Sequence, residues 1–463
     1  MSKSIQRLQV SGLHGRLDVT IDFLDDVSIF MGPNGIGKST VLNIFVFCLT
    51  RQWQRLAKQS FDSVYIRFAN DQVVHISRKE CLDLLSMELS TRNQQVATAL
   101  AEQGVLEEFL EGKAVSFDLM HMSEQSSKFE ARDLRVFRNN MLQYGDAIRS
   151  LISLTEAGAA IQRNFTDKIV YLPTYRRIEQ DISEVLSLAP GLAKRIQHDI
   201  NENIGANQGN YLELVRFGMD DITSLIEGHS SEIKEYSRQQ INSLSTRYLT
   251  AALQSRQSFP REFFSALSDK RIHDILARVD DEELNRKERV SITNLIKGLR
   301  SRENTGRLTR QQEQIASYFP MLAETHNRIS EKEIGLQKLA DLLNHYLNPT
   351  KHASYDQTRY SFSIRVDEAS VPLSGLSSGE KQIVSLFSTL MLMQDERVFV
   401  VIDEPELSLS VLWQELLIKD LMSIDSCRNI LAVTHSPFIY GTELAKFTRD
   451  LSDYTYTRGA ARG

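Results

Sequence analysis

Hydrophobic and polar positions follow two periods along this chain, and the change of period divides it. Near the N-terminus, Ile5–Val10, Leu17–Phe23 and Val27–Met31 are short β-prone runs. Ser63–Phe68 and Gln72–Ser77, separated by a short polar turn, have the spacing of a hairpin. We therefore expect the first 80 residues to be rich in strands.

From about residue 81, apolar residues recur three and four positions apart, which is the period of a helix. The pattern continues to about residue 355, with a short buried strand at Lys168–Leu172 that Pro173 ends. Strand character returns at Tyr360–Val366. The elements expected after it are the helix Gly379–Met393, the strand Arg397–Ile402, the helix Val411–Ile424 and the strand Ile430–Val433.

These patterns predict an α/β fold in which one head domain is assembled from the N- and C-terminal parts around a large α-helical insertion. We assign residues 1–80, 168–180 and 356–463 to the head. Residues 81–167 form a helical insertion, and residues 181–355 form a helical lobe or short stalk. Residues 181–355 lack the sustained heptads of a long coiled coil.

Composition excludes several classes of protein. The chain has 463 residues, of which 41% are hydrophobic and 25% charged, which is the balance of a globular protein and excludes a disordered chain. No apolar run reaches the ~18 residues of a membrane span, and the N-terminus lacks a secretory signal, so we expect a cytoplasmic protein without a membrane partner. The three cysteines are far apart, which argues against a disulfide framework or a zinc site. A net charge of −6 gives no global attraction for nucleic acid.

A glycine-rich segment between the strand Val27–Met31 and the expected helix Ser39–Leu49 matches the P-loop pattern G-x-x-x-x-G-K-[ST]. Its backbone N–H groups would surround phosphate oxygens, Lys38 would reach the β- and γ-phosphates, and the Ser39 hydroxyl would bind Mg²⁺. The residues that we predict to bind ATP here are Gly32, Pro33, Asn34, Gly35, Ile36, Gly37, Lys38, Ser39 and Thr40.

Two buried strands near the C-terminus end in residues suited to phosphate chemistry. The first ends in Asp403 and Glu404, at the sheet edge where open α/β sheets bind their ligands. Asp403 is the second predicted Mg²⁺ ligand beside Ser39, and Glu404 is the predicted base or orienter of the attacking water. The second strand ends in His435, a candidate γ-phosphate sensor. The predicted catalytic residues are thus Glu404, His435 and Lys38.

A third segment, Ser377-Ser378-Gly379 followed by Glu380, opens the helix before the Asp403 strand. A helix N-terminus with small residues attracts anions and permits close approach of a phosphate. The structural alternative is a serine N-cap with Glu380 completing a capping box, and the two interpretations are compatible.

The order of P-loop, Ser-Ser-Gly-Glu segment, Asp-Glu strand and histidine resembles ABC-type ATPase heads. Asp403-Glu-Pro-Glu406 and Thr434-His-Ser-Pro437 are similar to the branch with the SMC and Rad50 heads, RecF and the OLD proteins. The resemblance implies an ATP-hydrolysing protein that pairs with itself head-to-tail. ATP would then lie between the P-loop of one copy and Ser377, Ser378 and Gly379 of the other. Glu380 in place of the usual glutamine, and Ser410-Val411 in place of His-Pro, depart from the pattern.

Tyr171–Glu179 and Arg216–Asp220 resemble the ATPase subunits of two-gene anti-phage systems, namely Septu and retron-associated PtuA, or AriA of PARIS. Gln180 is a candidate Q-loop residue, and Arg176 and Arg177 are candidates to contact phosphate or a partner. The chain shows no Toprim or HNH nuclease of its own. The resemblance therefore implies a separately encoded nuclease effector of the Toprim or HNH type.

One window of the helical part is strongly basic. This basic window, Arg286–Arg310, contains only two acidic residues, Glu288 and Glu303. Its basic residues are Arg286, Lys287, Arg289, Lys297, Arg300, Arg302, Arg307 and Arg310. Such a window grips DNA phosphates, docks a partner or forms a solvated face, and no aromatic residue is present for base stacking.

The leading hypothesis is an ABC-type sensor or regulatory ATPase of a bacterial anti-phage complex. The alternatives are a RecF- or Rad50-like DNA-repair clamp, a transporter ATPase subunit, and a head that holds ATP as a structural element.

Overall fold

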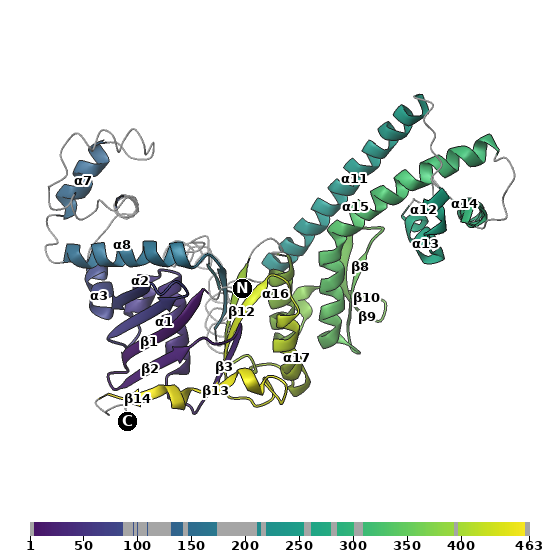
Figure 1. Cartoon of the computed structure of the whole chain (residues 1–463). Helices are drawn as coiled ribbons and strands as arrows, with labels where there is room; N and C mark the ends of the chain where they lie inside the picture. The colour runs from purple at the N-terminus through teal and green to yellow at the C-terminus, as the bar shows by residue number, and fades with distance from the viewer. Residues whose placement is uncertain are drawn as a thin grey trace, which may run out of the picture. The chain divides into compact units, whose positions relative to one another are not determined.

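A computed structural model describes most of the chain. The residues described are 4–86, 96, 100, 109, 131–141, 147–173, 211–213, 219–253, 261–278, 285–300, 309–392 and 397–458. Their contacts define two compact units, one of residues 1–216 with 395–463 and one of residues 217–394 (Figure 1). Arg176, Arg177, Gln180, Arg302 and Arg307 lie outside the described residues.

The first unit contains a six-stranded sheet with the order β13-β3-β12-β11-β6-β7, in which every neighbouring pair is parallel. Its central strand β11 is buried at every position, as expected for a parallel strand covered on both faces. Its strands are β3 (Val27–Met31), β6 (Lys168–Leu172), β7 (Tyr211–Glu213), β11 (Val398–Asp403), β12 (Cys427–Thr434) and β13 (Thr448–Asp450).

The register of this sheet aligns the strand ends that carry the predicted chemistry. Asp403 at the end of β11 pairs with Val433 of β12, and Thr434 pairs with Met31 at the end of β3. Because parallel strands end at the same edge, the P-loop and the residues after β11 and β12 meet there.

A five-stranded antiparallel sheet of order β14-β2-β1-β4-β5 completes the framework of the first unit. Helix α1 (Lys38–Leu49) is buried along most of its length, and its Phe45 ring stacks on Phe23 and meets Phe399 edge-on, with centroids 5.3 and 5.7 Å away. The two sheets and α1 thus share one hydrophobic core. The strands are β1 (Ile5–Leu13), β2 (Leu17–Asp22), β4 (Ser63–Phe68), β5 (Val73–Ser77) and β14 (Thr455–Thr457).

The described residues of the first unit also form further helices. Helix α8 packs on α3 and on strand β5. The helices are α2 (Trp53–Ala57), α3 (Arg78–Ser86), α7 (Ala131–Met141), α8 (Ala147–Asn164) and α17 (Val411–Met422), with the 3₁₀ turns Ala445–Phe447 and Leu451–Tyr454.

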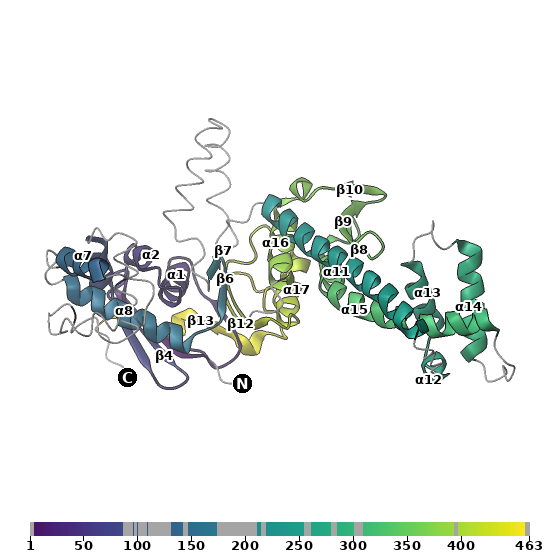
Figure 2. The ribbon, with the colours of Figure 1, turned by 90° about the horizontal axis from the view of Figure 1, so that it is seen from above.

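The second unit is built on two long helices that run side by side, α11 (Met219–Leu253) and α15 (Arg310–Leu347) (Figures 1 and 2). At one end, three short helices share a small apolar core with α15, including Phe264, Ile296 and Phe319. These are α12 (Arg261–Ser265), α13 (Asp269–Ala277) and α14 (Arg286–Arg300), and we call them the tip helices.

At the other end of α15, a small sheet of order β10-β9-β8 follows, and then the helix α16 (Ser378–Leu392). Helix α16 packs on both α11 and α15. The remaining elements are β8 (His352–Asp356), β9 (Ser361–Val366), β10 (Ala369–Val371) and the 3₁₀ turn Leu373–Gly375.

The predicted fold class is confirmed: strands from both ends of the chain form a parallel and an antiparallel sheet, and a large, mostly helical part is inserted between them in the sequence. The two compact units divide the chain at other positions than the predicted domains. The first unit includes the predicted insertion 81–167 and the predicted lobe up to residue 216, whereas residues 356–394 group with the second unit, in which α16 packs on the two long helices. The functional division of the chain into these domains stays a prediction. Among the described helices, none combines the length and apolar character needed to cross a membrane.

Candidate nucleotide site

The loop between β3 and α1, which is predicted to bind phosphate, contains glycines in backbone conformations that other residues rarely adopt. Gly35 and Gly37 have φ angles of 86° and 98°, in the left-handed region that glycine adopts without a Cβ penalty. A Cβ added to Gly37 would also stand 2.7 Å from the Leu13 side chain. Glycine is therefore required at position 37 by both conformation and space.

Lys38 folds back over this loop. It is only 5% exposed, and its ammonium donates to the carbonyls of Gly32 at 2.8 Å and Pro33 at 3.0 Å. Burial lowers the pKa of Lys38, and neighbouring carboxylates oppose that shift. These carboxylates belong to Glu404, Asp403, Glu406 and Asp450.

The two predicted Mg²⁺ ligands are in contact. The Ser39 hydroxyl donates to Asp403 Oδ1 at 3.0 Å, and Asp403 is 5% exposed at the end of β11. A hydroxyl and a carboxylate are oxygen ligands of the kind that Mg²⁺ prefers, so the donor set fits this ion. Their roles as ligands stay predictions.

Glu404 and His435 face each other across the ends of β11 and β12. His435 Nε2 lies 3.7 Å from Glu404 Oε1, and the side chains are 31% and 27% exposed, so both groups remain open to a ligand. Glu404 has a φ of 50°, and its N–H donates to the Val433 carbonyl at 2.8 Å. An unusual backbone conformation thus directs this side chain, as is frequent at functional sites.

Several residues at this edge were not singled out by the sequence. His14 Nε2 lies 3.3 Å from the Thr40 hydroxyl, and Asp450 at the end of β13 lies close enough to influence Lys38. Glu406 accepts two hydrogen bonds from the end of β12. Of these three residues, only Glu406 belongs to a motif that the sequence analysis identified, the Asp-Glu-Pro-Glu segment.

The Ser377–Gly379 segment belongs to the second unit and forms the start of α16. Glu380 Oε2 accepts from the Ser377 N–H at 2.7 Å, which completes the expected capping box. Its other oxygen pairs with the Lys351 ammonium at 2.6 Å. Burial raises the pKa of Glu380, but Lys351 and Ser377 outweigh it, so the net pKa is lowered and the carboxylate stays ionised.

Tyr171, in the segment that resembles the defence ATPases, has a structural role. Its ring is 1% exposed, and its hydroxyl donates to Asn43 of α1 at 2.7 Å. The functional candidates after it lie outside the described residues.

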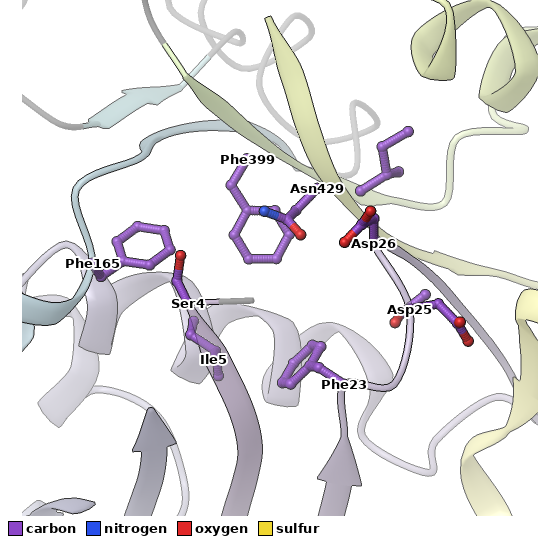
Figure 3. A pocket seen from close by; sticks show the side chains of 10 residues that line it. Ser4, Ile5, Phe23, Asp25, Asp26, Phe165, Phe399 and Asn429 are labelled. Atoms are coloured by element: carbon purple, nitrogen blue, oxygen red, sulfur yellow. The ribbon is translucent and has the colours of Figure 1, made fainter. Parts of the chain in front are cut away.

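A small hollow lies at the opposite ends of the same strands, away from the nucleotide edge. Figure 3 shows Phe23, Phe165 and Phe399 around it, with Asp25 and Asp26 to one side. None of the predicted site residues lines it. It is separate from the P-loop, and we assign it no ligand.

Several cations of the basic window form hydrogen bonds or ion pairs within the tip helices. Arg289 donates to the Leu276 carbonyl at 2.8 Å, and Arg300 donates to the Leu267 carbonyl at 3.0 Å. Lys297 and Arg300 both pair with Asp269, at 2.9 and 2.8 Å. These cations stabilise helix ends and neighbouring helices.

A phosphate-binding loop, a lysine folded over it, and a hydroxyl–carboxylate pair at the end of a parallel sheet define the class of P-loop nucleotide-binding proteins. The family model described as AAA ATPase domain matches residues 4–440. The chain belongs to this AAA ATPase family. No curated protein matches the sequence significantly.

Among solved structures, the chain is similar to an Smc head domain with an extended coiled coil, bound to the C-terminal domain of ScpA, from Pyrococcus furiosus. The identity is 12%, the coverage is 94% of this chain and 90% of that chain, and the TM-score is 0.30. An SmcHead bound to the C-winged helix domain of ScpA matches at 10% identity, 95% and 91% coverage and a TM-score of 0.30.

Proposed function

We propose that this protein hydrolyses ATP at a site completed by a second copy of the chain. The observation that carries the proposal is the convergence of Ser39 with Asp403, and of Glu404 with His435, at the P-loop edge of one sheet. These pairs supply cation ligands and groups for proton transfer around one place where a γ-phosphate would lie.

In the proposed reaction, Lys38 leaves the loop carbonyls and binds the β- and γ-phosphate oxygens. Glu404 orients the attacking water and accepts its proton, and His435 donates to an oxygen of the γ-phosphate. Bound Mg²⁺, held through Ser39 and Asp403, would neutralise charge that develops on the phosphates. The result is cleavage of ATP to ADP and phosphate.

The second copy would contribute the start of its α16. Ser377, Ser378 and Gly379 present hydroxyls and N–H groups at a helix N-terminus, which favours a phosphate anion. The capping box and the Lys351 ion pair hold this segment in position. A single copy is therefore expected to hydrolyse ATP slowly.

We further propose that ATP turnover regulates a separate effector, a nuclease of the Toprim or HNH type, in an anti-phage complex. The support is the resemblance of Tyr171–Glu179 and Arg216–Asp220 to the ATPase subunits of such systems. The DNA-clamp alternative is weaker, because Arg289, Lys297 and Arg300 of its basic window bind other tip residues.

The test is steady-state ATPase activity of the full chain, with Lys38→Ala, Glu404→Gln and the surface control Lys58→Ala. We expect turnover by the wild type and the control, loss of ATP binding in Lys38→Ala, and ATP retained without turnover in Glu404→Gln. Turnover in Glu404→Gln at the wild-type rate would remove its catalytic role. Purification of the chain with its genomic neighbours tests the effector: recovery with DNA but no nuclease would favour the clamp.

A further inference from the structure

Glu406 lies two residues beyond the predicted catalytic Glu404, and its side chain turns to the neighbouring strand. Its Oε2 accepts from the Thr434 hydroxyl at 2.7 Å, and its Oε1 accepts from the His435 N–H at 2.7 Å. Both distances are those of charge-assisted hydrogen bonds, which are stronger than neutral ones. One carboxylate therefore fixes two consecutive residues at the end of β12.

The surrounding bonds make this end of the sheet a closed network. The Thr434 hydroxyl also accepts from the Ser436 N–H at 2.9 Å. The Ser436 hydroxyl donates to Gln414 of α17 at 2.6 Å, and Gln414 donates to the Leu409 carbonyl at 3.0 Å. The loops after β11 and β12 are thereby joined by hydrogen bonds, and Glu406 is the member of this network that binds the His435 N–H.

We propose that Glu406 is a positioning residue that sets the place of the His435 imidazole relative to Glu404. It acts on the backbone of His435 and does not itself touch the nucleotide. The His435 backbone is held by Glu406, the Glu404 backbone is held by Val433, and the two side chains then stand 3.7 Å apart. This inference rests on the proposed ATP hydrolysis.

A positioning role of Glu406 and a role in ATP binding predict different effects when its charge is removed. Its carboxylate lies near Lys38 and favours the charged ammonium, but it also adds negative charge where phosphates would bind. Removing it should leave ATP affinity unchanged or improve it. Loss of histidine alignment should lower kcat, since a misplacement of about 1 Å costs about 100-fold in rate.

The experiment compares Glu406→Ala, Glu406→Gln and Thr434→Val with the control Glu415→Ala, an exposed carboxylate on α17. ATP affinity and kcat are measured on the full chain. We expect Glu406→Ala to lose about 100-fold in kcat at unchanged ATP affinity. We expect Glu406→Gln to recover most of that loss, because its amide oxygen accepts from His435 and its NH₂ donates to Thr434. Thr434→Val removes one of the two bonds to Glu406 and also the acceptor of the Ser436 N–H, but it keeps the bond from Glu406 to the His435 N–H, so its kcat should fall between those of the wild type and Glu406→Ala.

Two results would overturn the proposal. Wild-type kcat in Glu406→Ala would mean that His435 needs no such support. Equal loss in Glu406→Ala and Glu406→Gln would mean that the negative charge itself acts on the reaction. If Glu406→Ala does not fold, Thr434→Val and Glu406→Gln decide by the same criteria. If the wild type itself shows no turnover, the proposed function fails, which is distinct from either result.

Discussion

The Ser39 hydroxyl donates a 3.0 Å hydrogen bond to the Asp403 carboxylate, although 364 positions separate the two residues in the chain. The bond joins the N-terminal P-loop to the C-terminal strand β11. It also brings the two predicted Mg²⁺ ligands together near Lys38, whose ammonium binds the carbonyls of the loop.

Replacement of Asp403 by asparagine should weaken the use of Mg²⁺. The substitution keeps the shape but removes the charged oxygen ligand, and we expect the Mg²⁺ needed for half-maximal ATPase activity to rise about 10- to 100-fold. Titration of activity with MgCl₂ measures the effect. Asp425→Asn, an exposed acid elsewhere on the same unit, is the control and should behave like the wild type. An unchanged Mg²⁺ requirement in Asp403→Asn would show that another group holds the ion.

Lys351→Met should impair turnover without weakening ATP binding by the isolated chain. It leaves the Glu380 carboxylate, which is 6% exposed, without its cation at the start of α16, and a largely buried charge without its partner destabilises the segment around it. The P-loop belongs to the other unit and is untouched. Lys338→Met, exposed on α15, is the matched control. Reduced ATP affinity with normal kcat would contradict this account.

His326 should make the second unit sensitive to acid. Burial lowers its pKa to about 4, with Arg278 and Arg271 acting in the same direction and Asp274 against it. The folded state therefore holds the imidazole neutral, while the unfolded chain takes up a proton below its ordinary value of 6.5. Stability from this group is complete above pH 6.5 and is lost progressively towards pH 4. Between pH 7 and pH 5, the midpoint temperature of thermal unfolding should fall less for His326→Gln than for the wild type. Equal falls in the two proteins would refute this role of His326.

Arg289→Ala should destabilise the tip helices, whereas Lys287→Ala on the same helix should not. The Arg289 guanidinium binds the Leu276 carbonyl at the end of α13, and a hydrogen bond to a charged group contributes about 1.5–3 kcal/mol. Lys287 is an exposed surface position, where substitutions usually stay within about 0.5 kcal/mol. Chemical denaturation compares the two. Equal effects would mean that the basic window acts only as a solvated surface.

The parallel sheet could be predicted from the sequence where a strand and the predicted site residues after it follow each other directly in the chain. Strand β11 is wholly apolar until Asp403, and β3 runs directly into the glycine-rich loop, so both position and chemistry were readable. The capping box of Ser377 and Glu380 was also expected and is confirmed.

The remaining features depend on tertiary contacts that no local pattern records. Strands β7, β10, β13 and β14 have only three residues each and exist through their pairing with longer neighbours. Lys351 meets Glu380 from 29 positions away, and Glu406 reaches Thr434 from 28 positions away. The number of cations in the basic window is visible in the sequence, but the sequence does not show which of them bind Asp269 or backbone carbonyls.

We propose that ATP is hydrolysed at a site shared by two copies of the chain. The most direct test mixes two inactive variants, Lys38→Ala and Ser378→Arg, and measures ATPase activity of the mixture against each variant alone. A mixed pair contains one intact site, formed by the P-loop of the Ser378→Arg chain and the Ser377–Gly379 segment of the Lys38→Ala chain. We predict that mixing restores turnover. A mixture as inactive as its components, under conditions where the two chains associate, would contradict the shared site.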